Sequence, residues 1–278
     1  MQARSIMVDD PLEDFTPRTM TFESKTKKVY VSGRGPAAIV LPEMPGISPA
    51  VSRLARWVRD AGFTVFLPSL YGRDGVVPTV EEGEEIFNRA CVSAEFNAMA
   101  SGRSSPISSW LKALARASHA ECGGRGVGAI GLCFTGNFAL SMMLEPAMLA
   151  PVISEPALPL KEPGGLEISP EELEAVKTRM ERENLVALGY RFRGDPFCTA
   201  ARFAAYEKAL GTRFRGRVIE DEHGNREVSA FFAKFTPAPH CVLTQHLIDK
   251  AGEPTMAARD EVLNFFRERL LPDGAASA

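Results

Sequence analysis

The stretch GVGAIGLCFTG, residues 126–136, gives the strongest indication of how this chain folds. Its first half is a run of small and apolar residues from Gly126 to Gly131, which is typical of a strand buried on both faces of a sheet. Its second half is a turn around Cys133, and an apolar helix is predicted from Cys133 to about Leu144. A buried strand, a sharp turn and a helix in immediate succession lift the turn residue above the edge of a parallel sheet.

Outward from this stretch, short apolar runs alternate with helical patterns along the whole chain. Further strands are predicted at residues 20–23, 28–31, 37–41, 64–67, 151–153, 185–190 and 214–219. Further helices are predicted at residues 49–61, 106–119, 170–183, 199–210 and 255–271. This alternation predicts an α/β fold with a mostly parallel central sheet and helices on both faces.

The chain is expected to form a single domain with short extensions. Residues 1–18 are polar and are interpreted as an N-terminal tail or an arm that covers an edge, residues 19–272 as the domain, and residues 273–278 as a frayed C-terminus. The irregular stretch 72–105 is longer than ordinary connections, so it is a candidate lid or substrate-binding segment.

Composition argues against several classes of partner and site. The net charge of -3 gives no attraction to nucleic acid or to anionic membranes, and acidic residues near the N-terminus take the place of a signal peptide's apolar core. No stretch approaches the length of a spanning helix, so we predict a cytoplasmic protein. Five cysteines without a CxxC pair and only four histidines predict no disulfide scaffold, no metal site and no cofactor.

Cys133 is the candidate nucleophile, because it occupies the centre of a turn that resembles the nucleophile elbow, G-x-S-x-G. The backbone N–H of Phe134 would then point toward a developing oxyanion. Thr135 departs from the pattern, since glycine comes one residue later. The alternative for Cys133 is a small, inert, buried thiol. The other four cysteines lack this setting and are interpreted as core or loop residues.

An elbow nucleophile is followed in the chain by an acid and then by a histidine. Asp195 follows the predicted strand 185–190, although a helix-capping carboxylate is an alternative reading. His240 follows the last predicted strand and precedes the closing helix, which is the expected place for the base. His246 and His223 remain alternatives, whereas His119 precedes Cys133 and so violates the order.

Glu43 opens the loop after the predicted strand 37–41, where this kind of fold supplies its second oxyanion donor, here the N–H of Met44. A carboxylate close to developing negative charge is unusual for an ordinary esterase. It is explained if Glu43 exchanges a proton with the thiol. The alternative is a solvated loop residue.

Together these features resemble the dienelactone hydrolase family, over roughly Tyr30 to Leu270. The shared marks are LPEMPG at 41–46, LPSLYGR at 67–73, the cysteine elbow, and the later acid and histidine. The resemblance implies an α/β-hydrolase fold and hydrolysis of an enol-lactone or similar activated ester through a thioester, without metal or organic cofactor. It also implies a triad of Cys133, His240 and Asp195, with Glu43 holding or receiving the thiol proton.

Two departures from the family concern the substrate more than the chemistry. The family binds a substrate carboxylate with arginines, for which Arg73, Arg89 and Arg103 are candidates only by their location, and residues 221–239 look like an insertion. The expected partner is a small ester or lactone; the substrate itself and the oligomeric state are left open. The alternatives are a thioesterase or acyltransferase on the same fold, and a non-catalytic binding or thiol-sensing protein.

Overall fold

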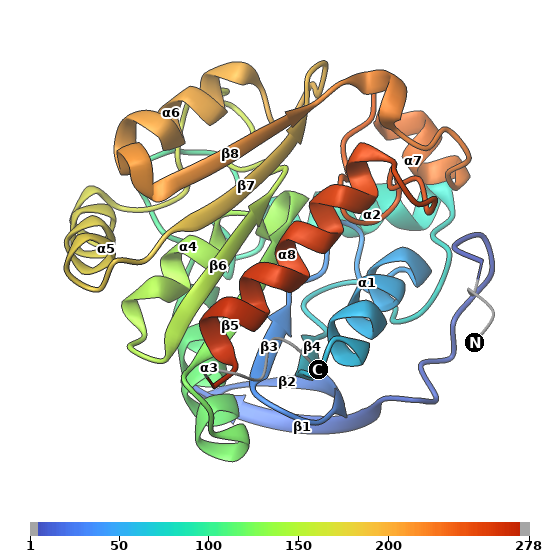
Figure 1. The fold of residues 1–278 in the computed structure, drawn as a ribbon. Helices are drawn as coiled ribbons and strands as arrows, with labels where there is room; N and C mark the ends of the chain where they lie inside the picture. The colour runs from blue at the N-terminus through green and yellow to red at the C-terminus, as the bar shows by residue number, and fades with distance from the viewer. Residues whose placement is uncertain (1–4, 273–278) are drawn as a thin grey trace.

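The computed structural model of the chain describes residues 5–272, which form one twisted sheet covered by helices on both faces (Figure 1). The sheet has eight strands in the order β1-β2-β4-β3-β5-β6-β7-β8. The strands are β1 (Thr16–Phe22), β2 (Lys25–Gly33), β3 (Ala37–Val40), β4 (Thr64–Pro68), β5 (Val127–Leu132), β6 (Met148–Ser154), β7 (Ala187–Phe192) and β8 (Phe214–Ile219). The predicted α/β fold class is therefore confirmed.

Strand directions bring the candidate site residues to one edge of the sheet. Strands β1, β2 and β4 pair antiparallel, whereas β4, β3, β5, β6, β7 and β8 run parallel to one another. Parallel strands end at the same edge, and this is where open α/β sheets bind ligands. The loops that follow β3, β5, β6 and β7 therefore meet there.

The helices form two layers, with α1 and α8 crossing the front of the sheet in Figure 1 and α3 to α6 on the opposite face. The helices are α1 (Pro49–Asp60), α2 (Val80–Val92), α3 (Ile107–Cys122), α4 (Phe138–Ser141), α5 (Pro170–Arg182), α6 (Ala200–Leu210), α7 (Ala230–Phe235) and α8 (Pro254–Leu270). Strand β3 shows why both layers are needed. Ala37 and Ile39 belong to the core under α3, while Ala38 and Val40 belong to the core under α1 and α8.

Two helices were not predicted. Helix α2 lies inside the segment 72–105, and it begins with a capping box in which Thr79 and Glu82 each bond the other's backbone N–H. The T-x-x-E spacing at 79–82 was therefore an available signal. Helix α7 lies inside the insertion-like segment 221–239 and is only six residues long, too short to show a periodic pattern.

The apolar helix predicted from Cys133 to about Leu144 is not continuous. A 3-10 turn over Cys133–Thr135 is followed by α4, which has four residues, and by a second 3-10 turn over Met142–Leu144. The N–H of Gly136 donates to the carbonyl of Cys133, three residues earlier, at 2.9 Å. A bond over three residues instead of four winds the chain more tightly than an α-helix does.

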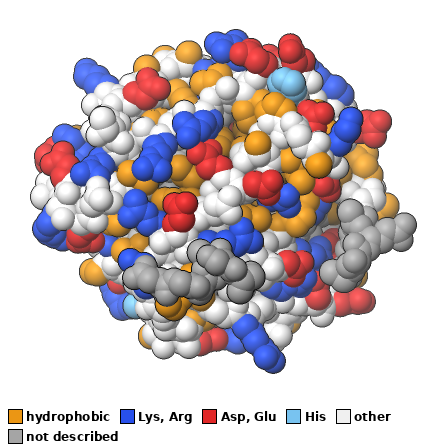
Figure 2. Space-filling model, in the orientation of Figure 1, with side chains coloured by type: hydrophobic (Ala, Val, Ile, Leu, Met, Phe, Trp, Pro, Cys, Tyr) orange, Lys and Arg blue, Asp and Glu red, His pale blue; other side chains and the backbone are white. Residues whose placement is uncertain are grey.

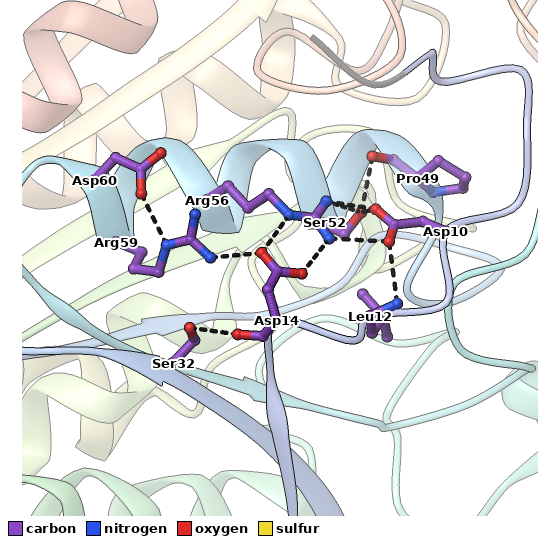
Figure 3. A network of polar contacts seen from close by, with 9 residues as sticks. All are labelled: Asp10, Leu12, Asp14, Ser32, Pro49, Ser52, Arg56, Arg59 and Asp60. Carbon is purple, nitrogen blue, oxygen red and sulfur yellow. Dashed lines mark hydrogen bonds and ion pairs between the residues drawn. The ribbon is translucent and has the colours of Figure 1, made fainter. Parts of the chain in front are cut away.

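The N-terminal arm is shorter and better anchored than the predicted tail over 1–18. Strand β1 begins at Thr16, and the preceding residues are held against α1 by ion pairs (Figure 3). Arg56 donates to Asp14 at 2.7 and 2.8 Å and to Asp10 at 2.9 Å, and Arg59 donates to Asp14 at 2.5 Å. The predicted frayed C-terminus, 273–278, lies outside the described residues, as do residues 1–4.

The surface shows no large field of one sign on the face seen in Figure 2, where basic and acidic side chains are interspersed. Within residues 5–272, no helix is both long and apolar enough to cross a bilayer.

Candidate active site

The turn after β5 holds Cys133 in a strained conformation. Its φ is 50°, in the left-handed region, which costs a non-glycine residue of order 1–3 kcal/mol. Glycines on either side make the turn possible. A Cβ on Gly131 would lie 2.4 Å from the carbonyl oxygen of Thr135, and one on Gly136 would lie 2.6 Å from Cα of Pro156. This strand, turn and strain are the geometry of a nucleophile elbow.

Thr135, which departs from the elbow pattern, has a structural role. Its hydroxyl accepts a hydrogen bond from the N–H of Leu132 at 3.0 Å and lies 3.2 Å from the carbonyl oxygen of Pro42. The side chain therefore links the elbow to the loop that carries Glu43 and Met44. The glycine displaced by one position, Gly136, provides the close approach to the loop after β6.

Asp195 and His240 form a buried pair. His240 Nδ1 lies 2.7 Å from Asp195 Oδ2, and the other oxygen of Asp195 accepts the N–H groups of Phe197 at 2.8 Å and Cys198 at 3.0 Å. The carboxylate is thus held on both sides. His240 Nε2 is buried without a hydrogen-bond partner among residues 5–272, and it is the nitrogen left to exchange a proton.

Burial acts to lower the pKa of His240, but the charge of Asp195 and the thiol of Cys133 raise it well above the usual value. Both side chains line one cavity of about 80 Å³. The structure therefore brings the sequence candidates Cys133, His240 and Asp195 together. Phe134 and Met44 line the same cavity, as expected of residues whose N–H groups face a developing oxyanion.

Glu43 is completely buried rather than solvated. Its Oε2 accepts the hydroxyl of Thr244 at 2.6 Å, while Oε1 has no hydrogen-bond partner at ordinary distance among the described residues. Burial raises the pKa of Glu43 to about 7, although hydrogen bonds from Thr244 and Cys241 and the charge of His240 act to lower it. The glutamate can therefore gain or lose a proton near neutral pH, but the side chains that bond to it are those of Thr244 and Cys241 rather than the thiol of Cys133.

A second buried carboxylate, Glu155, was not singled out from the sequence. It follows β6, and its Oε2 accepts the N–H of Val242 at 3.1 Å and the hydroxyl of Ser154. Its Oε1 has no hydrogen-bond partner within the part of the chain that the structure describes. Burial raises the pKa of Glu155 to about 8, against the lowering effect of the nearby charge of His240. An available signal was the Glu-Pro pair directly after an apolar strand, as in Glu155-Pro156.

Cys241 is also part of this surrounding layer. The thiol is fully buried, and burial together with the charge of Glu43 raises its pKa well above the usual value. Its interpretation as a core residue agrees with that burial. The layer behind Cys133 and His240 thus contains a second thiol and two carboxyl groups to which no basic side chain in the described part of the chain is hydrogen-bonded.

The other histidines occupy different environments. His246 is buried, and its Nδ1 accepts the N–H groups of His240 at 3.3 Å and Cys241 at 3.1 Å. Burial lowers the pKa of His246 to about 3, so the ring is a neutral acceptor that holds the backbone of the His240 loop. His223 lies 3.5 Å from Glu253, and His119 lies 3.3 Å from the carbonyl of Gly124.

The structure does not bring the three arginine candidates to the cavity. Arg73 pairs with Glu82 at 2.7 Å and Arg89 lies 3.6 Å from Glu85, with both arginine side chains more than half exposed. Arg103 is exposed as well. Among the described residues, no lysine or arginine lines the cavity with Cys133. Phenylalanines dominate the lining instead: Phe87, Phe134, Phe197, Phe231, Phe232 and Phe235.

This arrangement can perform nucleophilic acyl chemistry. It offers a thiol on a strained turn and a base oriented by a carboxylate, which line one cavity together with Phe134 and Met44. Within residues 5–272, no group of three or more His, Cys, Asp or Glu side chains is arranged to hold a metal ion.

Comparisons with known proteins agree with this geometry. A family model described as the dienelactone hydrolase family matches residues 22–162. A search of curated proteins found no significant match.

Solved structures resemble the whole fold. A dienelactone hydrolase-like promiscuous phosphotriesterase from metagenomic libraries has a TM-score of 0.61 at 18% identity, over 92% of this chain and 99% of that one. A dienelactone hydrolase from Anabaena variabilis has a TM-score of 0.56 at 16% identity, over 93% and 100% of the two chains. An alpha-beta serine hydrolase homologue from Coxiella burnetii has a TM-score of 0.51 at 11% identity, over 89% and 95%. The shared fold is that of the α/β hydrolases.

Proposed function

This chain belongs to the dienelactone hydrolase family, and from that membership we propose that it is a cysteine-dependent hydrolase of an enol-lactone or another small activated ester. The observation that carries the proposal is the shared cavity of Cys133 and His240, with the second ring nitrogen of His240 bonded to Asp195. The membership supports hydrolysis of a carboxylic ester; the thiol nucleophile and the thioester are our additions.

In the proposed reaction, Sγ of Cys133 attacks the ester carbonyl carbon while His240 Nε2 takes the thiol proton. The N–H groups of Phe134 and Met44 bind the oxyanion, and one such donor is typically worth about 2.7–4 kcal/mol. Collapse breaks the bond to the leaving oxygen, which receives the proton from His240 and leaves an acyl thioester on Cys133.

Water completes the cycle. His240 takes a proton from the water as its oxygen attacks the thioester, and the collapse of this second intermediate returns the proton to the sulfur of Cys133. Asp195 orients His240 and stabilises the charged ring in both halves. Enol and phenol leaving groups suit a thiol nucleophile better than simple alcohols do, because they are weaker bases than alkoxides and compete better with the sulfur for departure from the tetrahedral intermediate.

The test is to trap the thioester. The protein is mixed with a 4-nitrophenyl ester, quenched in acid, and digested, and the acylated peptide is identified by mass spectrometry. We expect the wild type to carry the acyl mass on Cys133 and to turn over the ester. Cys133→Ala should lose both the acyl mass and the turnover. Cys122→Ser, on the outer helix α3, is the matched control and keeps both. Acyl mass on another residue, or full turnover by Cys133→Ala, contradicts the proposal.

The same assay distinguishes the proposed hydrolase from the two alternative functions. A thioesterase or acyltransferase turns over a thioester faster than the matched oxygen ester, or transfers the acyl group to an added alcohol or thiol in preference to water. A thiol-sensing protein reacts with iodoacetamide at Cys133 but releases no product from any ester or lactone.

A further inference from the structure

The cavity beside Cys133 is built by two segments that the sequence marks as unusual. Helix α2 from the long segment 72–105 contributes Phe87, and helix α7 from the insertion-like segment 221–239 contributes Phe231, Phe232 and Phe235. Segments that differ from the rest of a family are where a shared reaction is given a particular substrate.

The two helices are packed directly against each other (Figure 1). A Cβ on Gly83 of α2 would lie 2.1 Å from the ring of Phe231, so the absence of a side chain at 83 is what lets this ring lie against α2. On the outer side, Lys234 donates to Glu84 at 2.6 Å. The aromatic cluster is therefore a fixed wall: the ring centroid of Phe231 lies 5.2 Å from that of Phe232 and 4.8 Å from that of Phe235.

No lysine or arginine side chain among the described residues lines this wall. The carboxyl groups nearest the reacting pair belong to Asp195, Glu43 and Glu155. The buried guanidinium of Arg53 donates to the carbonyl of Thr244 at 2.9 Å, and that of Arg202 donates to the carbonyl of Pro159 at 2.7 Å. Neither lines the cavity; among the described residues the one basic side chain that does is His240, whose ring is bonded to Asp195.

We infer that this site takes uncharged esters whose acyl group is small and apolar, and that it rejects acyl groups that carry a carboxylate. An ionised carboxylate in the cavity would lose its water and gain neither a cation nor a hydrogen-bond donor from the phenylalanines. The volume of about 80 Å³ limits the group to a small one. This inference rests on the proposed function, and it departs from the arginine-bound carboxylate that the family resemblance implies.

The experiment compares three esters that share one leaving group. They are 4-nitrophenyl butyrate, the 4-nitrophenyl ester of hemisuccinate, in which a carboxylate replaces the terminal methyl, and the methyl ester of the latter, which restores neutrality. We expect the kcat/KM of the wild type to be about 100-fold or more higher for butyrate than for hemisuccinate, because the buried charge lacks a partner. The neutral methyl ester should recover most of the loss.

Two variants test whether the preference for butyrate over hemisuccinate arises in the cavity. Phe235 is half-buried, so Phe235→Arg puts a cation at the wall with little disturbance, and Phe235→Leu is the neutral control. We expect Phe235→Arg to reduce the preference for butyrate at least about 10-fold, and Phe235→Leu to leave it within about 3-fold. Circular dichroism and the unfolding midpoint check that both variants are folded.

The outcomes separate the two proposals. If hemisuccinate is hydrolysed as fast as butyrate, and Cys133→Ala abolishes both reactions, the substrate inference is wrong and the proposed function stands. If the wild type hydrolyses none of the three esters in a Cys133-dependent manner, the proposed function is wrong and the inference is lost with it.

Discussion

Two pairs of carboxylates in this molecule show what a cationic partner changes. Asp10 and Asp14, in the N-terminal arm, are bound by Arg56 and Arg59 of α1 (Figure 3). Glu43 and Glu155, in the layer behind the active-site cavity, accept hydrogen bonds from hydroxyl and backbone groups but have no basic partner bonded to them among the described residues.

The protonation of the two pairs differs accordingly. Although burial acts to raise it, the pKa of Asp10 falls to about 2 through Arg56 and Ser52, and hydrogen bonds from Arg56 hold the pKa of Asp14 below its usual range. Burial raises the pKa of Glu43 to about 7 and that of Glu155 to about 8. A paired carboxylate is a fixed charge that anchors a segment, whereas an unpaired buried one can exchange a proton near neutral pH.

The largest difference between the active-site layer and the N-terminal arm is expected in catalytic activity. His240→Ala should lower kcat/KM by about 10⁴-fold or more, because the loss of the base disables the nucleophile as well. His246→Ala is the matched control for loss of an imidazole from the same loop, and it should retain far more activity, since His246 bonds to the loop backbone and to Thr236 but does not line the cavity. Ester turnover and an unfolding curve are measured for each. The reverse ranking would show that His246 is the base.

The next effect is on stability. Arg56→Met should lower the free energy of unfolding by about 3 kcal/mol, because it removes the buried guanidinium that binds both Asp10 and Asp14. The kcat of the folded fraction should not change. Arg18→Met is the control: its pair with Glu121 has the same 2.7 Å spacing as the Arg56–Asp14 pair but is about 40% exposed, so its loss should cost only about 0–1 kcal/mol.

Urea unfolding followed by circular dichroism measures both variants. Equal losses for Arg56→Met and Arg18→Met would mean that the arm network in Figure 3 contributes no more than an ordinary surface pair.

A smaller effect is expected when Glu43 is changed. If its ionised form receives the thiol proton, kcat/KM rises as the pH passes about 7, and Glu43→Gln removes that rise and lowers the rate at pH 8 by about 10–100-fold. Thr244→Val tests whether the rise in rate reports the ionisation of Glu43. The hydroxyl of Thr244 lowers the pKa of Glu43, so without it the rise should move to higher pH with little change in the plateau. A pH profile of Glu43→Gln identical to that of the wild type would exclude this role.

Much of the site was predictable because its signals are local. The apolar run before Cys133 and the small residues around it specify the elbow, and the order of loops along the chain places Asp195 and His240 at the same edge of a parallel sheet. Pro42-Glu43 could be recognised for the same reason, since it directly follows a buried strand.

The rest of the site and of the fold depends on contacts between segments that are far apart in the sequence. No local sequence pattern predicts such contacts. The aromatic wall exists only because α2 and α7 meet, and the arginine candidates were chosen by proximity in sequence, although Arg73 and Arg89 turn outward to Glu82 and Glu85. The arm over 1–18 seemed a tail because its acidic residues find their partners on α1, more than 40 positions away.

The smallest predicted effect is on the pH dependence of the free energy of unfolding, which should differ between the two pairs of carboxylates. The pKa of Glu155 rises from 4.5 to about 8 on folding, so between these values the native state keeps a proton that the unfolded chain releases. Its contribution is therefore present in full below pH 4.5 and is lost as the pH rises toward 8. The pKa of Asp10 falls from 3.8 to about 2, so its contribution is present above pH 3.8 and is lost as the pH falls toward 2.

Glu155→Gln should therefore flatten the decline in unfolding free energy between pH 4.5 and 8, because glutamine has no proton to release over that range. Asp10→Asn should leave that range unchanged and flatten the acid side below pH 3.8. Urea unfolding at half-unit pH steps measures both. A Glu155→Gln curve parallel to that of the wild type from pH 4.5 to 8 would mean that Glu155 is ionised in the native protein despite its burial. The two pairs of carboxylates would then differ in their partners but not in their charge.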